Sequence, residues 1–144
     1  MPDIGTGAVL AGGDAIDAAL TRIILYVQDV DRLARFYRDA FGLQVVEEIK
    51  GEWVVLRAGA CELALHRVGK PYRVADASSW KAESNAKLVL SVDRGLTKLR
   101  AELVAKGIPM REIKSYPGLT GPLCDGEDPE GNVFQLAQRA RSAG

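Results

Sequence analysis

Polar and apolar residues alternate in two short stretches that lie about 65 residues apart in the chain. Residues 22–27 read Arg-Ile-Ile-Leu-Tyr-Val and residues 87–92 read Lys-Leu-Val-Leu-Ser-Val, so every second position in each is Ile, Leu or Val. Successive side chains of a strand point to opposite sides. Each stretch therefore predicts a strand with one apolar face, which we expect a helix to cover.

After each predicted strand the apolar positions change to the spacing of a helix. Residues 30–41 carry such a pattern between Asp29, which can cap the N-terminus, and Gly42, which can end the helix. Residues 96–104 repeat it after Asp93. The pattern predicts two amphipathic helices that pack on the apolar faces of the strands.

The two halves of the chain follow one plan, which is strand, helix and then several strands. When the last strands of the two halves are aligned in sequence, Ala64 corresponds to Gln135, and each lies between two apolar residues. The repeat predicts an α+β fold of two βαβββ modules, residues 21–69 and 86–139. We expect the modules to form a curved mixed sheet with the helices on its convex face.

The modules together predict a single domain over residues 21–139. Residues 1–20 would be an N-terminal extension and residues 140–144 a short tail. In the extension, Asp14 could cap a short helix over residues 15–20, or the segment could be a partly disordered arm. The glycines there have no phosphate-binding pattern around them.

The polar faces of the predicted strands would line the concave side of the sheet, opposite the helices. We expect this concave cup to bind the ligand of the protein. The residues predicted to line it are Arg22, Tyr26, Glu62, Ala64, His66, Lys87, Ser91 and Gln135.

Charge and composition exclude several classes of partner. The 19 Lys and Arg residues balance 19 Asp and Glu residues and form no basic run, which argues against nucleic acid or anionic membrane as a partner. The first residues have neither the basic region nor the continuous apolar region of a signal peptide, and no apolar run approaches the length of a membrane span. We expect a soluble, cytoplasmic protein whose cysteines, Cys61 and Cys124, are free thiols.

The segment at residues 127–136, Glu-Asp-Pro-Glu-Gly-Asn-Val-Phe-Gln-Leu, predicts a tight turn followed by a strand. Taken alone it predicts an ordinary hairpin. In its distance from the C-terminus, and together with the repeat, it resembles the last strand of the vicinal oxygen chelate superfamily. That superfamily includes glyoxalase I, extradiol dioxygenases and the fosfomycin- and bleomycin-resistance proteins. The resemblance covers residues 21–139 and implies the same two-module fold.

The resemblance also implies where a metal ion would bind. The four ligand positions of the family correspond to Arg22, Ala64, Lys87 and Gln135. Arg does not deprotonate, Lys would need a strongly lowered pKa, and Ala has no donor atom, so only Gln135 could coordinate. We therefore expect no cofactor at the usual site. A divalent metal at a displaced site, formed by Glu62 and His66 with Gln135 or Tyr26, is the alternative.

Two classes of function remain open. The first is a metal-independent binding protein similar to the bleomycin-resistance branch, whose ligand is a small organic molecule. Arg22 and Lys87 favour an anionic ligand if both point into the cup. Alternatively, both side chains reach solvent or pair with Glu62 and Glu83. The second is a lyase, isomerase or dioxygenase with a displaced metal, or a metal-free acid-base catalyst built on His66, Glu62 or Tyr26.

The resemblance further implies a homodimer, because short two-module members usually pair modules across subunits. The connection at residues 114–127 is either a lid over the cup or a surface loop.

Overall fold

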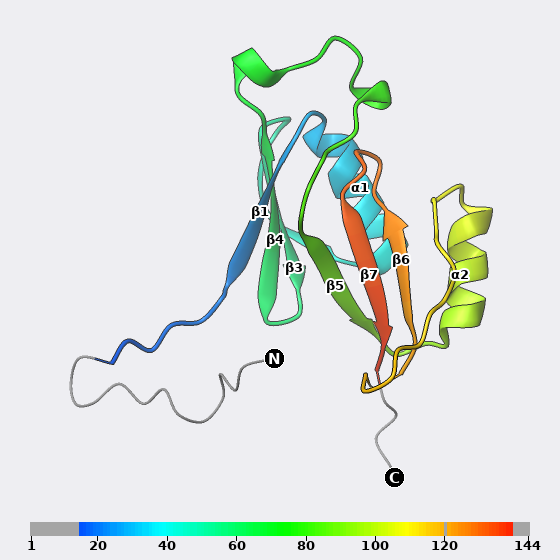
Figure 1. Ribbon diagram of the computed structural model, residues 1–144. Coiled ribbons are helices and arrows are strands. Elements are labelled where there is room, and N and C mark those ends of the chain that lie inside the picture. The colour runs from blue at the N-terminus through cyan, green and yellow to red at the C-terminus, as the bar shows by residue number, and fades with distance from the viewer. Residues whose placement is uncertain (1–14, 120, 140–144) are drawn as a thin grey trace.

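The computed structural model describes residues 15–119 and 121–139. It contains two modules placed side by side (Figure 1), each with a strand, a helix and further strands. The elements are β1 Arg22–Val27, α1 Val30–Phe41, β2 Gln44–Ile49, β3 Trp53–Ala58, β4 Cys61–Arg67, the 3₁₀ helices η2 Lys70–Tyr72 and η3 Ala77–Ser79, β5 Lys87–Val92, α2 Leu96–Ala105, β6 Leu123–Glu127 and β7 Val133–Gln138. No helix of the described residues is both long and apolar enough to cross a membrane.

The strands form two mixed sheets. The first has the order β1-β4-β3-β2 and the second the order β5-β7-β6. In each sheet the first strand of the module runs parallel to the last, and the remaining pairs are antiparallel. The α+β fold is thus confirmed, as is the equivalence of Ala64 and Gln135, which pair with Ile24 and Val89 at the middle of β1 and β5.

The second module departs from the predicted βαβββ pattern. Where the first module has β2, residues 110–114 make only two isolated bridges, from Met110 to Gly126 and from Lys114 to Leu123. A Pro at position 109 precedes this segment and lacks a backbone donor, which is unfavourable for a continuous ladder. The segment still lies beside β6, and this position matters for the site.

Helix α1 has the bounds that the sequence predicts. The side chain of Asp29 accepts a hydrogen bond from the backbone of Arg32 at 3.1 Å, and Gly42 ends the helix in the left-handed region at φ 69°. The cap of α2 differs from the prediction, because Gly95 and not Asp93 occupies the N-cap and offers no side-chain oxygen. Gln138 instead accepts a hydrogen bond from the Leu96 backbone at 3.3 Å.

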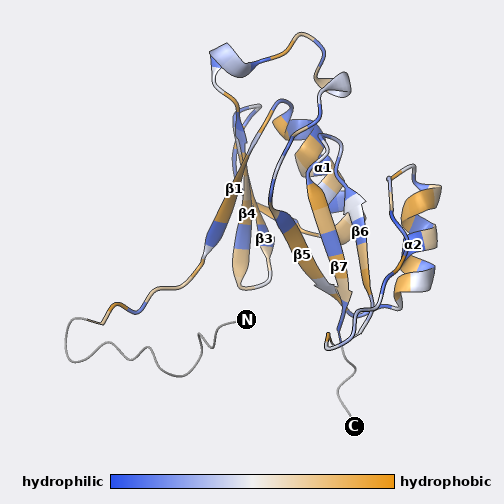
Figure 2. Ribbon diagram, in the orientation of Figure 1, coloured by the Kyte–Doolittle hydropathy of each residue, from blue (hydrophilic) through white to orange (hydrophobic). Residues whose placement is uncertain are grey.

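The apolar strand faces pack against the helices in two core clusters. Buried Leu33 and Tyr37 of α1 lie against the first sheet, and Leu99 and Leu103 of α2 lie against the second. Phe41 at the end of α1 packs against both clusters and so joins the modules. The hydropathy colouring shows the apolar stripes of the two helices and the strands they cover (Figure 2).

The turn before β7 also joins the modules, and it is more than the ordinary hairpin that the sequence suggests. Asp128 and Glu130 are fully buried carboxylates. The phenol of Tyr37 donates to Asp128 at 2.7 Å, and the backbone amides of Gln28 and Asp29 donate to the two oxygens of Glu130 at 2.7 and 2.8 Å. The turn therefore fixes the second module to the start of α1.

The described part of the N-terminal extension forms no helix. Residues 15–21 have no regular secondary structure and are exposed, with Ile16 at 83% and Leu20 at 74%. Of the two alternatives for this segment, the short helix over residues 15–20 is therefore wrong. Its apolar residues have no apolar surface of the described chain beside them, and a helix this short is unstable without tertiary packing. Asp14 and the tail at residues 140–144 lie outside the described residues.

Candidate functional site

The face of the first sheet that is turned away from α1 carries five of the predicted cup residues. The parallel register of β1 and β4 places Arg22 beside Glu62 and Tyr26 beside His66, with Ala64 between them. The guanidinium of Arg22 donates to one oxygen of Glu62 at 2.9 and 3.1 Å. The positive charge of Arg22 is therefore neutralised within its own sheet.

Aromatic rings gather at the other end of this face. The imidazole of His66 lies 5.2 Å from the ring of Tyr26 and 5.7 Å from that of Trp53, measured between ring centroids. The guanidinium of Arg22 lies 5.5 Å from the centroid of the Trp53 ring, within the range of a cation–π contact. Because Tyr26 is 62% exposed, its ring offers a face on which a planar molecule can stack.

His66 is held in one tautomer by its own strand. Its Nδ1 lies 2.6 Å from the backbone carbonyl of Arg67, and a carbonyl oxygen only accepts a hydrogen bond. Nδ1 of the neutral ring must then carry the proton. The lone pair of Nε2 remains as the acceptor or base on this side chain.

The second sheet carries the other predicted residues, and two of them, Lys87 and Gln135, converge on a carboxylate that the prediction did not include. Lys87 donates to one oxygen of Asp125 at 2.7 Å, and the amide nitrogen of Gln135 donates to the other at 2.9 Å. Burial alone would raise the pKa of Asp125, but these hydrogen bonds and the charges of Lys87 and Arg111 outweigh it, so the pKa lies below its ordinary value. Asp125 is therefore ionised at neutral pH.

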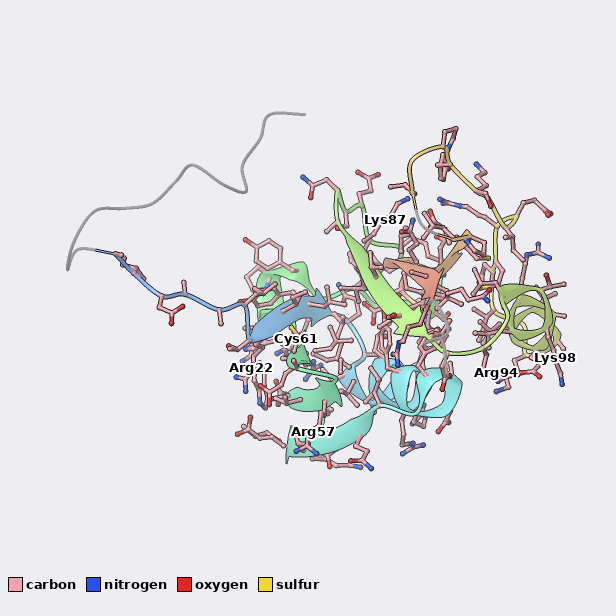
Figure 3. All side chains as sticks on the ribbon, turned by 90° about the horizontal axis from the view of Figure 1, so that it is seen from below. Arg22, Arg57, Cys61, Lys87, Arg94 and Lys98 are labelled. Carbon is pink, nitrogen blue, oxygen red and sulfur yellow. The ribbon has the colours of Figure 1, made fainter. Side chains whose placement is uncertain are left out.

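Ser91 lies apart from this group, at the far end of β5. Its hydroxyl accepts a hydrogen bond from Arg139 at 3.4 Å. Arg22 and Lys87 do not meet within one chain either: they lie on different sheets and far from each other in the view from below (Figure 3). Arg22 pairs with Glu62, which is the ion pair that the sequence suggested as an alternative to a ligand contact. Lys87 pairs with Asp125 and not with Glu83.

The residues at the four family ligand positions do not fit a divalent metal ion. Arg22 and Lys87 are cations held by carboxylates, and Ala64 is fully buried and has no donor atom. Gln135 keeps only a neutral amide oxygen, which is a weak ligand. At the displaced site, Glu62 accepts hydrogen bonds from Arg22. In the described ranges, no group of three or more His, Cys, Asp or Glu is placed to hold a metal ion.

Two side chains of the site were missed by reasoning from the sequence. Asp125 and Arg111 belong to segments that the repeat did not resolve into strands. The available signal was the alternation in residues 123–127, where Asp125 falls on the same face as Leu123 and Glu127. Period-two alternation over five residues is a weak signal when a glycine, here Gly126, interrupts the apolar positions.

Comparison with known proteins agrees with the fold and with the arrangement of the two modules. A family model described as a glyoxalase-like domain matches residues 22–137. The chain belongs to this family and hence to the vicinal oxygen chelate superfamily.

Solved structures with the same fold have different activities. Lactoylglutathione lyase from Agrobacterium tumefaciens is 23% identical, with a TM-score of 0.66, and the match covers 85% of this chain and 94% of that one. An antibiotic-binding protein from Streptomyces is 20% identical, with a TM-score of 0.63 and coverage of 88% and 99%. A fosfomycin resistance protein from Listeria monocytogenes is 12% identical, with a TM-score of 0.67 and coverage of 87% and 96%. At these identities the matches show the fold alone.

Proposed function

We propose that this chain is a small-molecule binding protein that holds an organic anion in its cup without the usual metal ion of the superfamily. The observation that carries the proposal is the state of the four ligand positions. Two hold ion-paired cations, one holds Ala64, and Gln135 donates to Asp125. These four side chains offer a divalent ion no carboxylate, imidazole or thiolate ligand. The antibiotic-binding relative from Streptomyces supports a binding role.

The two sheets supply complementary parts of such a site. The first sheet carries the aromatic group of Tyr26, His66 and Trp53, and the second carries a polar pocket around Lys87 and Asp125. Stacking on the first and charge pairing on the second favour a planar molecule with an anionic substituent.

A homodimer would complete the cup, and the free edges of the two sheets support it. Among the strands of residues 15–119 and 121–139, β1 pairs only with β4 and β5 pairs only with β7. Ile24 on β1 is 43% exposed and Val89 on β5 is 59% exposed. In a homodimer, β1 of one chain would lie beside β5 of the partner, which covers both edges and brings the aromatic and polar halves together.

Fluorescence of Trp53 tests the proposal directly. The chain has 2 Trp residues, so Trp80→Phe leaves Trp53 as the only indole reporter. We expect benzoate to quench Trp53 in a saturable manner, and benzamide, the neutral molecule of similar shape, to bind at least about tenfold more weakly. Equal affinity for the two molecules, or no saturable quenching at millimolar concentration, would contradict the proposal.

One observation favours a second candidate, a metal-free acid-base enzyme. The exposed Nε2 of His66 is free to accept a proton, and the ring is fixed by the Arg67 carbonyl. The lyase from Agrobacterium provides the assay. Lactoylglutathione lyase activity that is independent of added metal and lost in His66→Gln would establish this candidate in place of a pure binding role.

A further inference from the structure

A small cavity opens on the second sheet, over β6, β7 and the segment that replaces the missing strand. Its volume is about 200 Å³. Drug-sized ligands fill cavities of roughly 300–1,000 Å³, so this one suits a single functional group at one end of a ligand. Its lining combines three cations with two carboxylates: Lys87, Arg111, Glu112, Lys114, Tyr116, Leu123, Asp125 and Gln135.

We infer that Arg111 and Lys114 bind the anionic group of the ligand in this cavity and that the group is a carboxylate, an inference that rests on the proposed function. Lys87 is excluded from this role because it already donates to Asp125 at 2.7 Å. The nearest guanidinium nitrogen of Arg111 is 3.8 Å from Asp125, beyond hydrogen-bond distance. Arg111 therefore keeps its planar pair of donors, which match the two oxygens of a carboxylate.

Lys114 provides the second contact. Within the described ranges its ammonium takes part in no ion pair, so its charge is available. Glu112 does not neutralise Lys114, because its side chain is 84% exposed and forms its ion pair with Arg100 at 3.4 Å. Because Glu112 pairs with Arg100 and Asp125 pairs with Lys87, the charges of Arg111 and Lys114 remain to attract an anionic group.

The backbone holds these two side chains in place before a ligand arrives. Arg111 donates from its backbone amide to the Asp125 carbonyl at 2.9 Å, and Lys114 exchanges two backbone hydrogen bonds of 2.8 Å with Leu123. Met110 and Ile113 pack against the second core cluster. Arg111 and Lys114, which follow these two apolar residues, therefore line the cavity from a fixed segment, and this lowers the entropic cost of binding.

Titration of the full chain with benzoate tests the inference. We expect Arg111→Gln and Lys114→Gln each to weaken benzoate binding by about tenfold or more, since each removes a charge-assisted contact. Lys98→Gln is the matched control, because it removes the same charge from exposed Lys98 on α2 outside the cavity (Figure 3) and should leave the affinity unchanged. All three positions are exposed, so the variants should fold.

The outcomes separate this inference from the proposed function. If the double variant Arg111→Gln, Lys114→Gln bound benzoate as tightly as the wild type and Lys87→Gln did not bind it, the inference would be overturned. The proposed function would then still stand. Binding weakened equally by Lys98→Gln would also overturn it, since a general charge effect would then explain the loss. Absence of benzoate binding by the wild-type chain would overturn both.

Discussion

Tyr37→Phe isolates the hydrogen bond that joins α1 to the turn of the second module. Tyr37 is fully buried, and its hydroxyl lies 2.7 Å from Oδ2 of Asp128, which is itself buried. Burial raises the pKa of Tyr37 well above its ordinary value, and the charge of Asp128 raises it further, so the phenol stays protonated and is the donor. The substitution removes this donor and keeps the ring.

The loss of stability depends on the hydrogen bonds that the Asp128 carboxylate keeps after the substitution. Oδ2 of Asp128 retains the side-chain amide of Asn132 at 2.9 Å, and Oδ1 retains the backbone amides of Glu130 and Asn132. The carboxylate therefore still has hydrogen-bond donors around it. The free energy of unfolding falls by the contribution of one hydrogen bond to a charged group, about 1.5–3 kcal/mol. In a chain of 144 residues this lowers Tm by roughly 4–10 °C.

Equilibrium unfolding in urea measures this loss, with Tyr26→Phe as the control. Tyr26 is 62% exposed, and removing its hydroxyl should change the free energy of unfolding by less than about 0.5 kcal/mol. If Tyr37→Phe were no more destabilising than Tyr26→Phe, the buried bond would not stabilise the junction of the modules and the reasoning would be refuted.

Three further predictions concern the second module. Gly126→Ala should destabilise the fold by about 1–3 kcal/mol in urea, because a methyl group there would overlap the ring of Phe134 in a filled core. Gln138→Ala should cost about 0.5–2 kcal/mol, since Gln138 accepts from the Leu96 backbone at the start of α2. The pKa of Asp125 is lower in the folded chain than its ordinary value of 3.8, so ionised Asp125 stabilises the fold at pH values above 3.8. This contribution is lost as the pH falls through the folded-state pKa. The stability difference between the wild type and Asp125→Asn should therefore shrink below about pH 4.

Each of these predictions has a control. Gly69→Ala places a methyl group at ordinary contact distance from Pro71 and should be tolerated, unlike Gly126→Ala. Gln44→Ala removes an exposed amide from the start of β2 and should change stability little. A difference between wild type and Asp125→Asn that stayed constant from pH 7 to pH 3 would show that ionisation of Asp125 does not stabilise the fold.

The sequence predicts the first module better than the second. The cap at Asp29, the end at Gly42 and the apolar face of α1 agree with the structure because all three signals are local. The equivalence of Ala64 and Gln135 is also correct, because a strand has a strict period of two. In the second module Gly95 replaces the expected cap, and its partner Gln138 is distant in the sequence.

The site itself is less predictable, for the same physical reason. Arg22 and Lys87 occupy equivalent positions in the repeat, but whether their charges are free depends on Glu62 and Asp125, which are contributed by other strands. The buried role of Glu130 likewise depends on backbone amides about 100 residues away. Pairings over such separations are set by packing of the whole domain and leave no periodic signal in the sequence.

Thermal melting of metal-stripped protein tests the central claim most directly, with Ni, Zn, Mn, Co or anaerobic ferrous iron in one series and benzoate in the other. A ligand present at 100 times its Kd adds about 2.7 kcal/mol of stability, which is a readily measured rise in Tm. We predict a saturating rise with benzoate and no rise with any of the metals. A rise of several degrees with a metal that disappears in His66→Ala and Gln135→Ala would contradict the account and establish a displaced metal site.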